Sequence, residues 1–292
     1  MDKPVCKTKT ELKTLFLSSK TFVNKANMRL GIISALAEEQ QGLVEAMQGP
    51  YKLIHGQRTY WVGQLWEIDA VCVLSRIGKV AAAVTTTTLV EKFGVTHILF
   101  TGVAGAGDKS VRVGDIVVAE SLVQHDMDAS PLFPRFEVPL TGLTHFAADH
   151  RLSTRLADAA HAFLDDEFAR VIAPQEKAAF GLSRPRVHRG LIASGDQFMD
   201  DPVHINRLNV DLPGLVAVEM EGAAVAQACY ELAVPCAVMR TISDNANENA
   251  ATDFLRFVKS VAAQYAFYIV RRFCRQDEEL VQGQASSESA GT

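Results

Sequence analysis

Short runs of β-branched and aliphatic residues alternate with longer small-residue or amphipathic segments along most of this chain. The runs lie at residues 30–33, 70–74, 97–100, 115–119, 190–193, 216–218 and 236–241. Helical segments are expected at residues 80–93, 150–163, 221–232 and 254–273. Such alternation predicts an α/β fold, because a parallel strand pair needs a crossover connection that is usually a helix. We therefore expect three layers, with a mostly parallel central sheet between helices and a ligand site beyond the carboxyl ends of the strands.

The alternating pattern predicts one domain over residues 29–275, long enough to bury a sizeable core. Residues 1–28 are polar and lysine-rich and are predicted to be an N-terminal extension, with Met28 as an alternative start of the chain. Residues 276–292 are rich in Gln, Ser, Gly and Glu, which predicts a disordered tail. The last helical segment carries an apolar stripe, typical of a core or dimer surface, formed by Leu255, Val258, Ala262, Tyr265, Ile269 and Phe273.

Composition favours a cytoplasmic protein that binds a small molecule. The net charge of −5 argues against a nucleic-acid binder, whose surface carries a basic patch. Apolar runs fall short of the ~20 residues of a membrane-spanning helix, and the first 25 residues lack the pattern of a secretory signal. The 5 cysteines show no CxxC spacing, which fits free thiols in a reducing compartment.

Acidic and small residues gather directly after the expected strands, where such a sheet presents its ligand crevice. Glu219 and Glu221 flank Met220 after an apolar run, and carboxylates there are costly to desolvate unless they bind something polar. The other acids in such positions are Glu38, Glu39 and Asp244.

Each of these features also has a simpler interpretation. Glu38 and Glu39 are acids that the first turn of a helix favours, and Ser243 with Asp244 fits a helix N-cap. The glycines at 102, 105 and 107 do not have the dinucleotide-binding spacing. They fit either a turn that lets backbone approach a sugar or an ordinary tight turn.

Taken together, the segments resemble the methylthioadenosine/S-adenosylhomocysteine nucleosidases of the nucleoside phosphorylase superfamily. The matching segments occur in the family's order at residues 31–39, 76–83, 101–105, 113–118, 124–128, 190–198, 218–221 and 240–244. The resemblance implies hydrolysis of the N-glycosidic bond of methylthioadenosine, S-adenosylhomocysteine or both, which releases adenine and a 5′-modified ribose.

The resemblance also implies roles for particular residues. Glu39 activates the attacking water, Asp244 protonates N7 of adenine, and Ser243 orients Asp244. Glu221 and Met220 bind the ribose, while Phe198 stacks on the base. The full set of implied substrate contacts is Ala35, Ile77, Val103, Ala104, Gly105, Phe198, Met199, Glu219, Met220, Glu221, Arg240, Ala246 and Phe254.

A loop at residues 131–139 is expected to close the 5′ pocket of a neighbouring subunit in a homodimer. Its contact residues are Phe133, Phe136 and Pro139 of the partner subunit. The family uses no metal or organic cofactor, and water is the co-substrate.

The chain departs from the family at three places. Val103 stands where many members carry a serine that touches the ribose, Leu36 replaces a frequent methionine, and residues 165–185 form an insertion. We expect the insertion to alter the pocket rim or the dimer edge.

Three alternatives stay open at this point. A purine nucleoside phosphorylase needs phosphate-binding arginines, whereas this chain has Phe100 at one such position and acids in the first loop. A futalosine-type hydrolase would use the same acids on a different 5′ group. A non-catalytic nucleoside-binding module would not need both Glu39 and Asp244.

Overall fold

The computed structural model describes residues 28–199, 201–244 and 250–288, and its strands join into one sheet. The strands are β1 (Arg29–Ser34), β2 (Gln48–His55), β3 (Arg58–Leu65), β4 (Ile68–Leu74), β5 (His97–Ala106), β6 (Ile116–Gln124), β7 (His145–Ala147), β8 (Val187–Ser194), β9 (Leu215–Glu219) and β10 (Cys236–Asp244). All seven strand segments expected from the sequence are present, and each strand is two to six residues longer than its apolar run.

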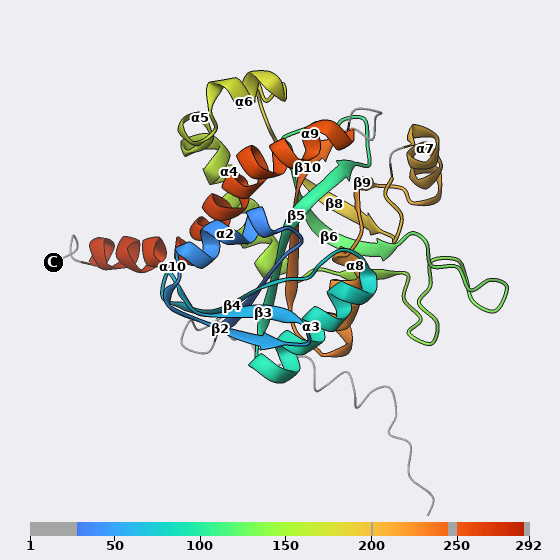
Figure 1. Cartoon of the computed structure of the whole chain (residues 1–292), viewed down its shortest axis with the longest axis horizontal. Helices are drawn as coiled ribbons and strands as arrows, with labels where there is room; N and C mark the ends of the chain where they lie inside the picture. Colours follow the sequence, from blue (N-terminus) through green and yellow to red (C-terminus); the bar gives the residue numbers. More distant parts are fainter. Residues whose placement is uncertain (1–27, 200, 245–249, 289–292) are drawn as a thin grey trace, which may run out of the picture.

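The sheet combines two groups of parallel strands. β4, β1, β5 and β10 are parallel neighbours, and so are β6, β8 and β9. Antiparallel pairs join the two groups, β10 with β6 and β5 with β9. As a result β5, β10, β6, β8 and β9 close into a ring (Figure 1). The expected α/β class is confirmed, and the closure of the sheet is a feature that local sequence patterns do not predict.

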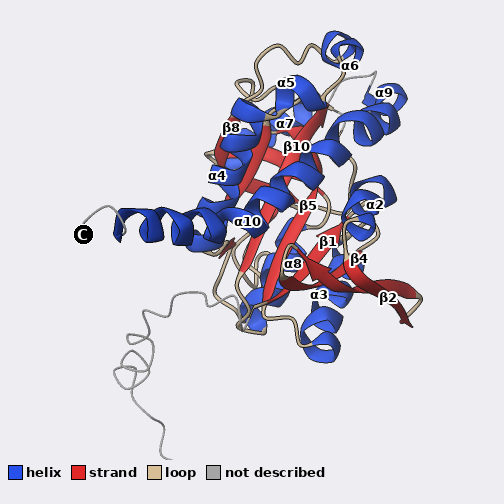
Figure 2. Cartoon of the chain, turned by 90° about the vertical axis from the view of Figure 1, so that its left-hand side faces the viewer, coloured by secondary structure: helices blue, strands red, loops and turns tan. Residues whose placement is uncertain are grey.

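Helices cover the sheet on two sides (Figures 1 and 2). They are α2 (Ala37–Glu45), α3 (Lys79–Phe93), α4 (His150–Asp166), α5 (Phe168–Val171), α6 (Pro174–Ala179), α7 (Pro202–Asp211), α8 (Gly222–Glu231), α9 (Ala250–Phe257), a π-helical segment (Val258–Ala262) and α10 (Ala263–Glu288). α10 contacts α2 and α4 over one buried apolar cluster, whereas α3 contacts α8 over a second cluster. Within the described ranges, no helix is both long and apolar enough to span a bilayer.

The apolar stripe of the last helical segment is buried as expected, from Val258 to Phe273. Leu255 is the exception, because its side chain is 66% exposed. Met28 is buried in the same cluster as this stripe. Residues 1–27 lie outside the described part of the chain. α10 extends to Glu288, so it includes residues 276–288, whose composition predicts disorder. Glu and Gln are good helix formers, which allows the helix to continue.

The β2–β3 hairpin was not predicted. All residues of β2 are exposed, so the strand has no alternation of buried and exposed positions to reveal it. Its turn, Gly56 and Gln57, has positive φ at both residues, which is the geometry of a tight hairpin turn.

The glycine-rich segment forms an extended strand, so the turn expected there is wrong. Gly102 and Gly105 lie inside β5, and the chain bends only from Gly107 onward. A Cβ on Gly102 would lie 3.3 Å from the Arg240 guanidinium, and one on Gly107 would lie 2.8 Å from backbone of β9. Close packing inside the sheet therefore explains these glycines better than turn geometry does.

The insertion at residues 165–185 contains α5 and α6 and is anchored to the last helices. Glu167 is buried and accepts a hydrogen bond from Arg272 Nε at 2.8 Å, and Glu176 pairs with Arg256 at 2.9 Å. Its effect on a dimer edge stays a prediction.

Candidate active site

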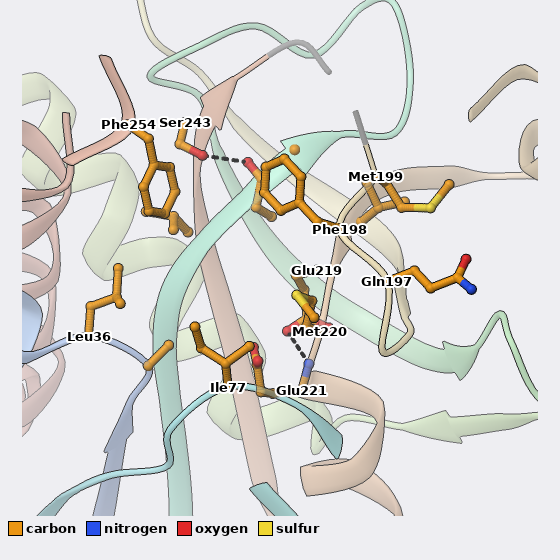
Figure 3. Close-up of a pocket in the computed structure, with 15 residues that line it drawn as sticks. Leu36, Ile77, Gln197, Phe198, Met199, Glu219, Met220, Glu221, Ser243 and Phe254 are labelled. Atoms are coloured by element: carbon orange, nitrogen blue, oxygen red, sulfur yellow. Dashed lines mark hydrogen bonds between the residues drawn. The ribbon is translucent and has the colours of Figure 1, made fainter. Parts of the chain in front are cut away.

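A pocket opens at the carboxyl ends of β1, β5, β8, β9 and β10, where the sequence predicts the ligand site. Its cavity has a volume of about 240 Å3, and Figure 3 shows how the strands and the loops after them surround it. The lining residues are Ala35, Leu36, Ile77, Val103, Ala104, Gly105, Gln197, Phe198, Met199, Val218, Glu219, Met220, Glu221, Ser243 and Phe254. The fold thus brings together most of the predicted contact residues from segments far apart in the chain.

Glu39 lies in the first turn of α2 and is 1% exposed. Its Oε2 accepts a hydrogen bond from the N–H of Leu36 at 3.1 Å, and Leu36 lines the pocket. Its Oε1 is buried without a hydrogen-bond partner among the described residues. Burial raises the pKa of Glu39 to about 7, although the Leu36 N–H and the charge of Arg240 oppose this shift. Glu39 therefore caps its helix next to a pocket residue, and its second carboxylate oxygen has no partner among the described residues.

Glu219 lines the pocket, but its carboxylate is occupied by protein groups. Oε2 lies 2.7 Å from Arg240 Nη2, and both oxygens accept from the N–H of Gly222 at 2.9 Å. Ser194 Oγ donates to Oε1. Glu219 therefore fixes the start of α8 and the position of Arg240.

Arg240 is among the largest fully buried side chains, at 1% exposure. Its guanidinium lies over the ring of Phe100, 3.9 Å from the ring centre, a favourable cation–π geometry. Its Nη1 donates to the carbonyl of Met239 at 2.9 Å, while Nε has no partner within the described residues. Arg240 does not line the cavity, so it acts on the pocket mainly through its charge.

Glu221 is the N-cap residue of α8 and is buried at the pocket wall. Its Oε1 accepts a hydrogen bond from the N–H of Gly78 at 2.8 Å. Burial and then the negative charge of Glu219 raise the pKa of Glu221 to about 7. Glu221 lines the pocket, whereas Glu39 is not a lining residue and is bonded to one, Leu36. Buried carboxyl groups with raised pKa values are common at catalytic sites.

Ser243 and Asp244 belong to β10, so the interpretation of this pair as a helix N-cap is wrong. Ser243 lines the pocket, and its Oγ donates to the carbonyl of Ala104 at 3.4 Å (Figure 3). Asp244 pairs in register with Gly105, another pocket residue, which places its backbone at the same edge. The side chain of Asp244 and the whole of Ala246 lie outside the described part of the chain.

Aromatic and aliphatic side chains form most of the remaining wall. Phe198 and Phe254 lie at the end of the pocket near Ser243, and Ile77 lies at the other end near Glu221 (Figure 3). Phe198 lines the pocket and is 56% exposed, so part of its side chain is accessible to a ligand. Flat, apolar walls with a few polar groups are typical of sites for small organic molecules.

The loop that was predicted to reach a partner subunit projects from the body of the molecule between β6 and β7 (Figure 1). Phe133, Phe136 and Pro139 are half-buried and do not line the pocket of their own chain. Phe136 packs against a buried cluster that includes Val123 and Leu191 of its own chain. The contact with a partner subunit stays a prediction.

Three lining residues were not among the predicted contacts: Leu36, Gln197 and Val218. Each lies within a segment that resembles the family and adjoins a predicted contact, so its place in that segment was the signal that could have identified it. No group of three or more His, Cys, Asp or Glu side chains among the described residues is arranged to hold a metal ion.

The sequence matches the family model of the phosphorylase superfamily over residues 29–275. A 5′-methylthioadenosine/S-adenosylhomocysteine nucleosidase from Shewanella halifaxensis is 33% identical over 243 residues, which cover 83% of this chain and 97% of that protein.

Solved structures show the same likeness. The 5′-methylthioadenosine/S-adenosylhomocysteine nucleosidase of Colwellia psychrerythraea in complex with adenine is 32% identical, with a TM-score of 0.73, covering 86% of this chain and 96% of that one. The futalosine hydrolase of Helicobacter pylori is 30% identical, with a TM-score of 0.72, covering 87% of this chain and 100% of that one.

Proposed function

Because the chain belongs to the phosphorylase superfamily, and within it to the 5′-methylthioadenosine/S-adenosylhomocysteine nucleosidases, we propose that its pocket hydrolyses the N-glycosidic bond of these nucleosides. The products are adenine and the 5′-modified ribose. One observation carries the proposal: two buried carboxyl groups lie at a pocket with largely apolar and aromatic walls, Glu221 in its lining and Glu39 next to it through a hydrogen bond to the lining residue Leu36.

Water attacks C1′ of the ribose while the bond from C1′ to N9 of adenine breaks. The sugar gains positive charge in the transition state, and a nearby carboxylate stabilises that charge and polarises the water. Glu39 is the base in this proposal and takes the proton from the water. A pKa of about 7 suits this task, because a base is most effective when its pKa is near the working pH.

The departing adenine carries the electron pair of the broken bond and must be protonated. Asp244 supplies this proton at N7, and Ser243 orients Asp244. Glu221 accepts hydrogen bonds from the ribose hydroxyls beside Met220, and Phe198 stacks on the base. Two acids with opposite protonation states thus act on opposite sides of the bond.

The 5′ substituent lies between Ile77 and Phe254 in this proposal. The other contacts are Ala35, Val103, Ala104, Gly105 and Met199 in the wall and Ala246 beyond β10. Arg240 and Glu219 act from behind the wall. Val103 offers no hydroxyl to the ribose, so Glu221 supplies more of the sugar recognition.

Hydrolysis is favoured over phosphorolysis by the surroundings of Arg240. Phosphate binding requires cations whose charge is available to it. Arg240 is paired with Glu219 and covered by Phe100, and the first turn of α2 contributes Glu38 and Glu39. These acids would repel phosphate, whereas a neutral water molecule is unaffected. A non-catalytic binding module is disfavoured, because binding alone gains nothing from two carboxyl groups with pKa values near 7.

Futalosine hydrolysis is the second candidate. The solved futalosine hydrolase of Helicobacter pylori is as similar to this chain as several of the nucleosidases are. Both reactions break the same kind of bond and need the same pair of acids, so the 5′ group alone separates them.

The active unit in this proposal is a homodimer in which residues 131–139 close the partner's pocket, with Phe133, Phe136 and Pro139 of the partner subunit at the 5′ group. The reaction needs water and no metal or organic cofactor. We infer a cytoplasmic location, because Cys72, Cys229 and Cys236 are buried free cysteines, as is usual in a reducing compartment.

Release of free adenine or hypoxanthine from a substrate panel tests the proposal. The panel holds methylthioadenosine, S-adenosylhomocysteine, adenosine, inosine and futalosine, each with and without phosphate. We expect adenine release from the first two at a rate that phosphate does not change. A phosphate-dependent rate would identify a phosphorylase, and preference for futalosine would identify the second candidate.

A further inference from the structure

Two loops that both contribute residues to the pocket are joined by hydrogen bonds between residues outside its lining. The first, at residues 75–79, follows β4 and carries Ile77 and Gly78. The second, at residues 195–199, follows β8 and carries Phe198. Both loops bond to Asp126, which lies just after β6 and outside the pocket lining.

The side chain of Asp126 bridges the two loops directly. Its Oδ1 accepts from Lys79 Nζ at 2.5 Å, and its Oδ2 accepts from the N–H of Asp196 at 2.9 Å. Asp196 Oδ1 in turn accepts from the N–H of Lys79 at 2.8 Å. Lys79 Nζ also donates to Gln124 Oε1 at 3.0 Å. We call the three residues Lys79, Asp126 and Asp196 the Asp126 clasp.

The clasp offsets an unfavourable feature of α3. Lys79 is the first residue of this helix, where the positive end of the helix dipole disfavours a cation. The N-cap residue, Gly78, has no side chain, and the first turn contains no acid. Asp196 supplies the missing cap from the other loop, and Asp126 neutralises the lysine. The position of the start of α3 therefore depends on groups outside the helix.

The same turn reaches the ribose side of the pocket. The N–H of Gly78 donates to Glu221 Oε1 at 2.8 Å, so a shift of this turn moves a hydrogen bond to a carboxylate at the pocket wall. Gly78 has a φ of +97°, and a Cβ there would lie 3.2 Å from Asp196 Oδ1. The clasp thus sets the distance between the Gly78 turn and the loop that carries Phe198.

We propose that Asp126 is a positioning residue for nucleoside hydrolysis. It fixes the position of the Gly78 turn, which bonds to Glu221, relative to the loop that carries Phe198. This inference rests on the proposed function. Because the clasp positions Glu221 and Phe198, which contact the sugar and the base in the proposed function, its loss weakens recognition of substrates with and without a 5′ group. Ile77 lies on the same loop and adds to the loss for methylthioadenosine.

The test compares Asp126→Ala with the wild-type enzyme on methylthioadenosine and on adenosine. We expect KM to rise on the order of tenfold for both substrates and kcat/KM to fall by about 10- to 100-fold, since misplaced binding groups weaken recognition and orientation. The dissociation constant for free adenine should rise as well. Damage that merely reduces the active fraction would lower kcat and leave KM and the adenine affinity unchanged.

Asp166→Ala is the matched control, because Asp166 accepts from Arg272 in an exposed ion pair on the insertion. It should behave as wild type. Lys79→Met removes the other half of the clasp, and the double variant with Asp126→Ala should show much less than the sum of the two single losses. If Asp126→Ala does not fold, Asp126→Asn and Lys79→Met carry the same comparison.

Adenine release by the wild-type enzyme distinguishes a failure of the proposed function from a failure of the clasp proposal. If the wild type does not hydrolyse these nucleosides, the proposed function fails. If the wild type is active and the clasp variants keep the wild-type KM and adenine affinity, the clasp proposal is overturned. A loss confined to methylthioadenosine also overturns it, because that pattern points to the 5′ pocket.

Discussion

Arg240 and Glu219 form a buried ion pair, with 2.7 Å between Nη2 and Oε2 and side-chain exposures of 1% and 3%. The ring of Phe100 packs against the guanidinium, and the N–H of Gly222 and the Oγ of Ser194 donate hydrogen bonds to the carboxylate. The positive charge of Arg240 lowers the pKa values of two further buried carboxyl groups, Glu39 and Glu221, but burial has the larger effect and raises both.

Glu219→Gln should destabilise the protein strongly. The substitution preserves shape but leaves the buried Arg240 without a counter-charge, and breaking a buried pair in this way costs about 3–5 kcal/mol. Chemical denaturation measures the change. Glu176→Gln is the control, because its partner Arg256 is half exposed and such pairs contribute less than about 1 kcal/mol. Equal, small effects of the two substitutions would contradict this view of the buried pair.

Glu39→Gln should lower kcat on the order of 10²- to 10⁴-fold, because glutamine cannot accept a proton from water. The affinity for adenine should change little, since the side chain keeps its size. Glu38→Gln, one residue earlier in the same turn, is the matched control and should retain activity. Near-normal turnover by Glu39→Gln would show that another group activates the water.

The rate should rise with pH through about 7, because Glu39 acts as a base only when ionised and burial raises its pKa to about 7. The pH profile of kcat/KM for methylthioadenosine measures this. A profile that stays flat across this pH range would remove Glu39 from the role of base.

Stability should change in the opposite direction. In the folded protein Glu39 holds its proton up to about pH 7, whereas in the unfolded chain it loses the proton near its ordinary pKa of 4.5. The contribution of Glu39 to the free energy of unfolding is therefore fully present below the pKa that Glu39 has in the unfolded chain. This contribution is lost as the pH rises through about 7. Accordingly, the Tm of Glu39→Gln should exceed that of the wild type above pH 7, and thermal unfolding at two pH values checks it.

Asp244→Asn should reduce kcat roughly 10²-fold or more, because asparagine cannot donate a proton to the leaving purine. Substrate affinity should weaken less, since the amide can still donate a hydrogen bond to N7. The register of Asp244 with Gly105 places it at the pocket edge, in a strand. A folded variant with normal kcat on methylthioadenosine would rule out this general acid.

Phe133→Ala should raise KM for methylthioadenosine far more than for adenosine, because an apolar 5′ group gains most from burial by a partner subunit. Phe136→Ala should do the same, with an added loss of stability because this ring packs on its own chain. Equal KM changes for the two nucleosides, or a fully active monomer in sedimentation experiments, would contradict the role of this loop.

The sequence by itself determined the α/β class, most of the strands and the identity of most pocket residues. Local patterns are sufficient for the fold class and for the acids at the site, because a buried strand is a short apolar run and polar residues after several such runs meet at one sheet edge. The apolar and aromatic pocket residues were identified through the resemblance to a known family. The motifs around Glu39 and Glu221 also fixed the expected chemistry through their resemblance to a known family.

Only the tertiary structure decided how those residues act on one another. Whether the sheet closes depends on pairings between strands distant in the chain, such as β10 with β6, which no local pattern encodes. The exposed strand β2 had no periodicity to detect, and the glycines of β5 were explained only by their close neighbours. The Asp126 clasp joins positions 79, 126 and 196, and the raised pKa of Glu39 depends on burial that its sequence neighbours do not reveal. Charges and hydrogen bonds act through space, so their partners become visible only when the chain is folded.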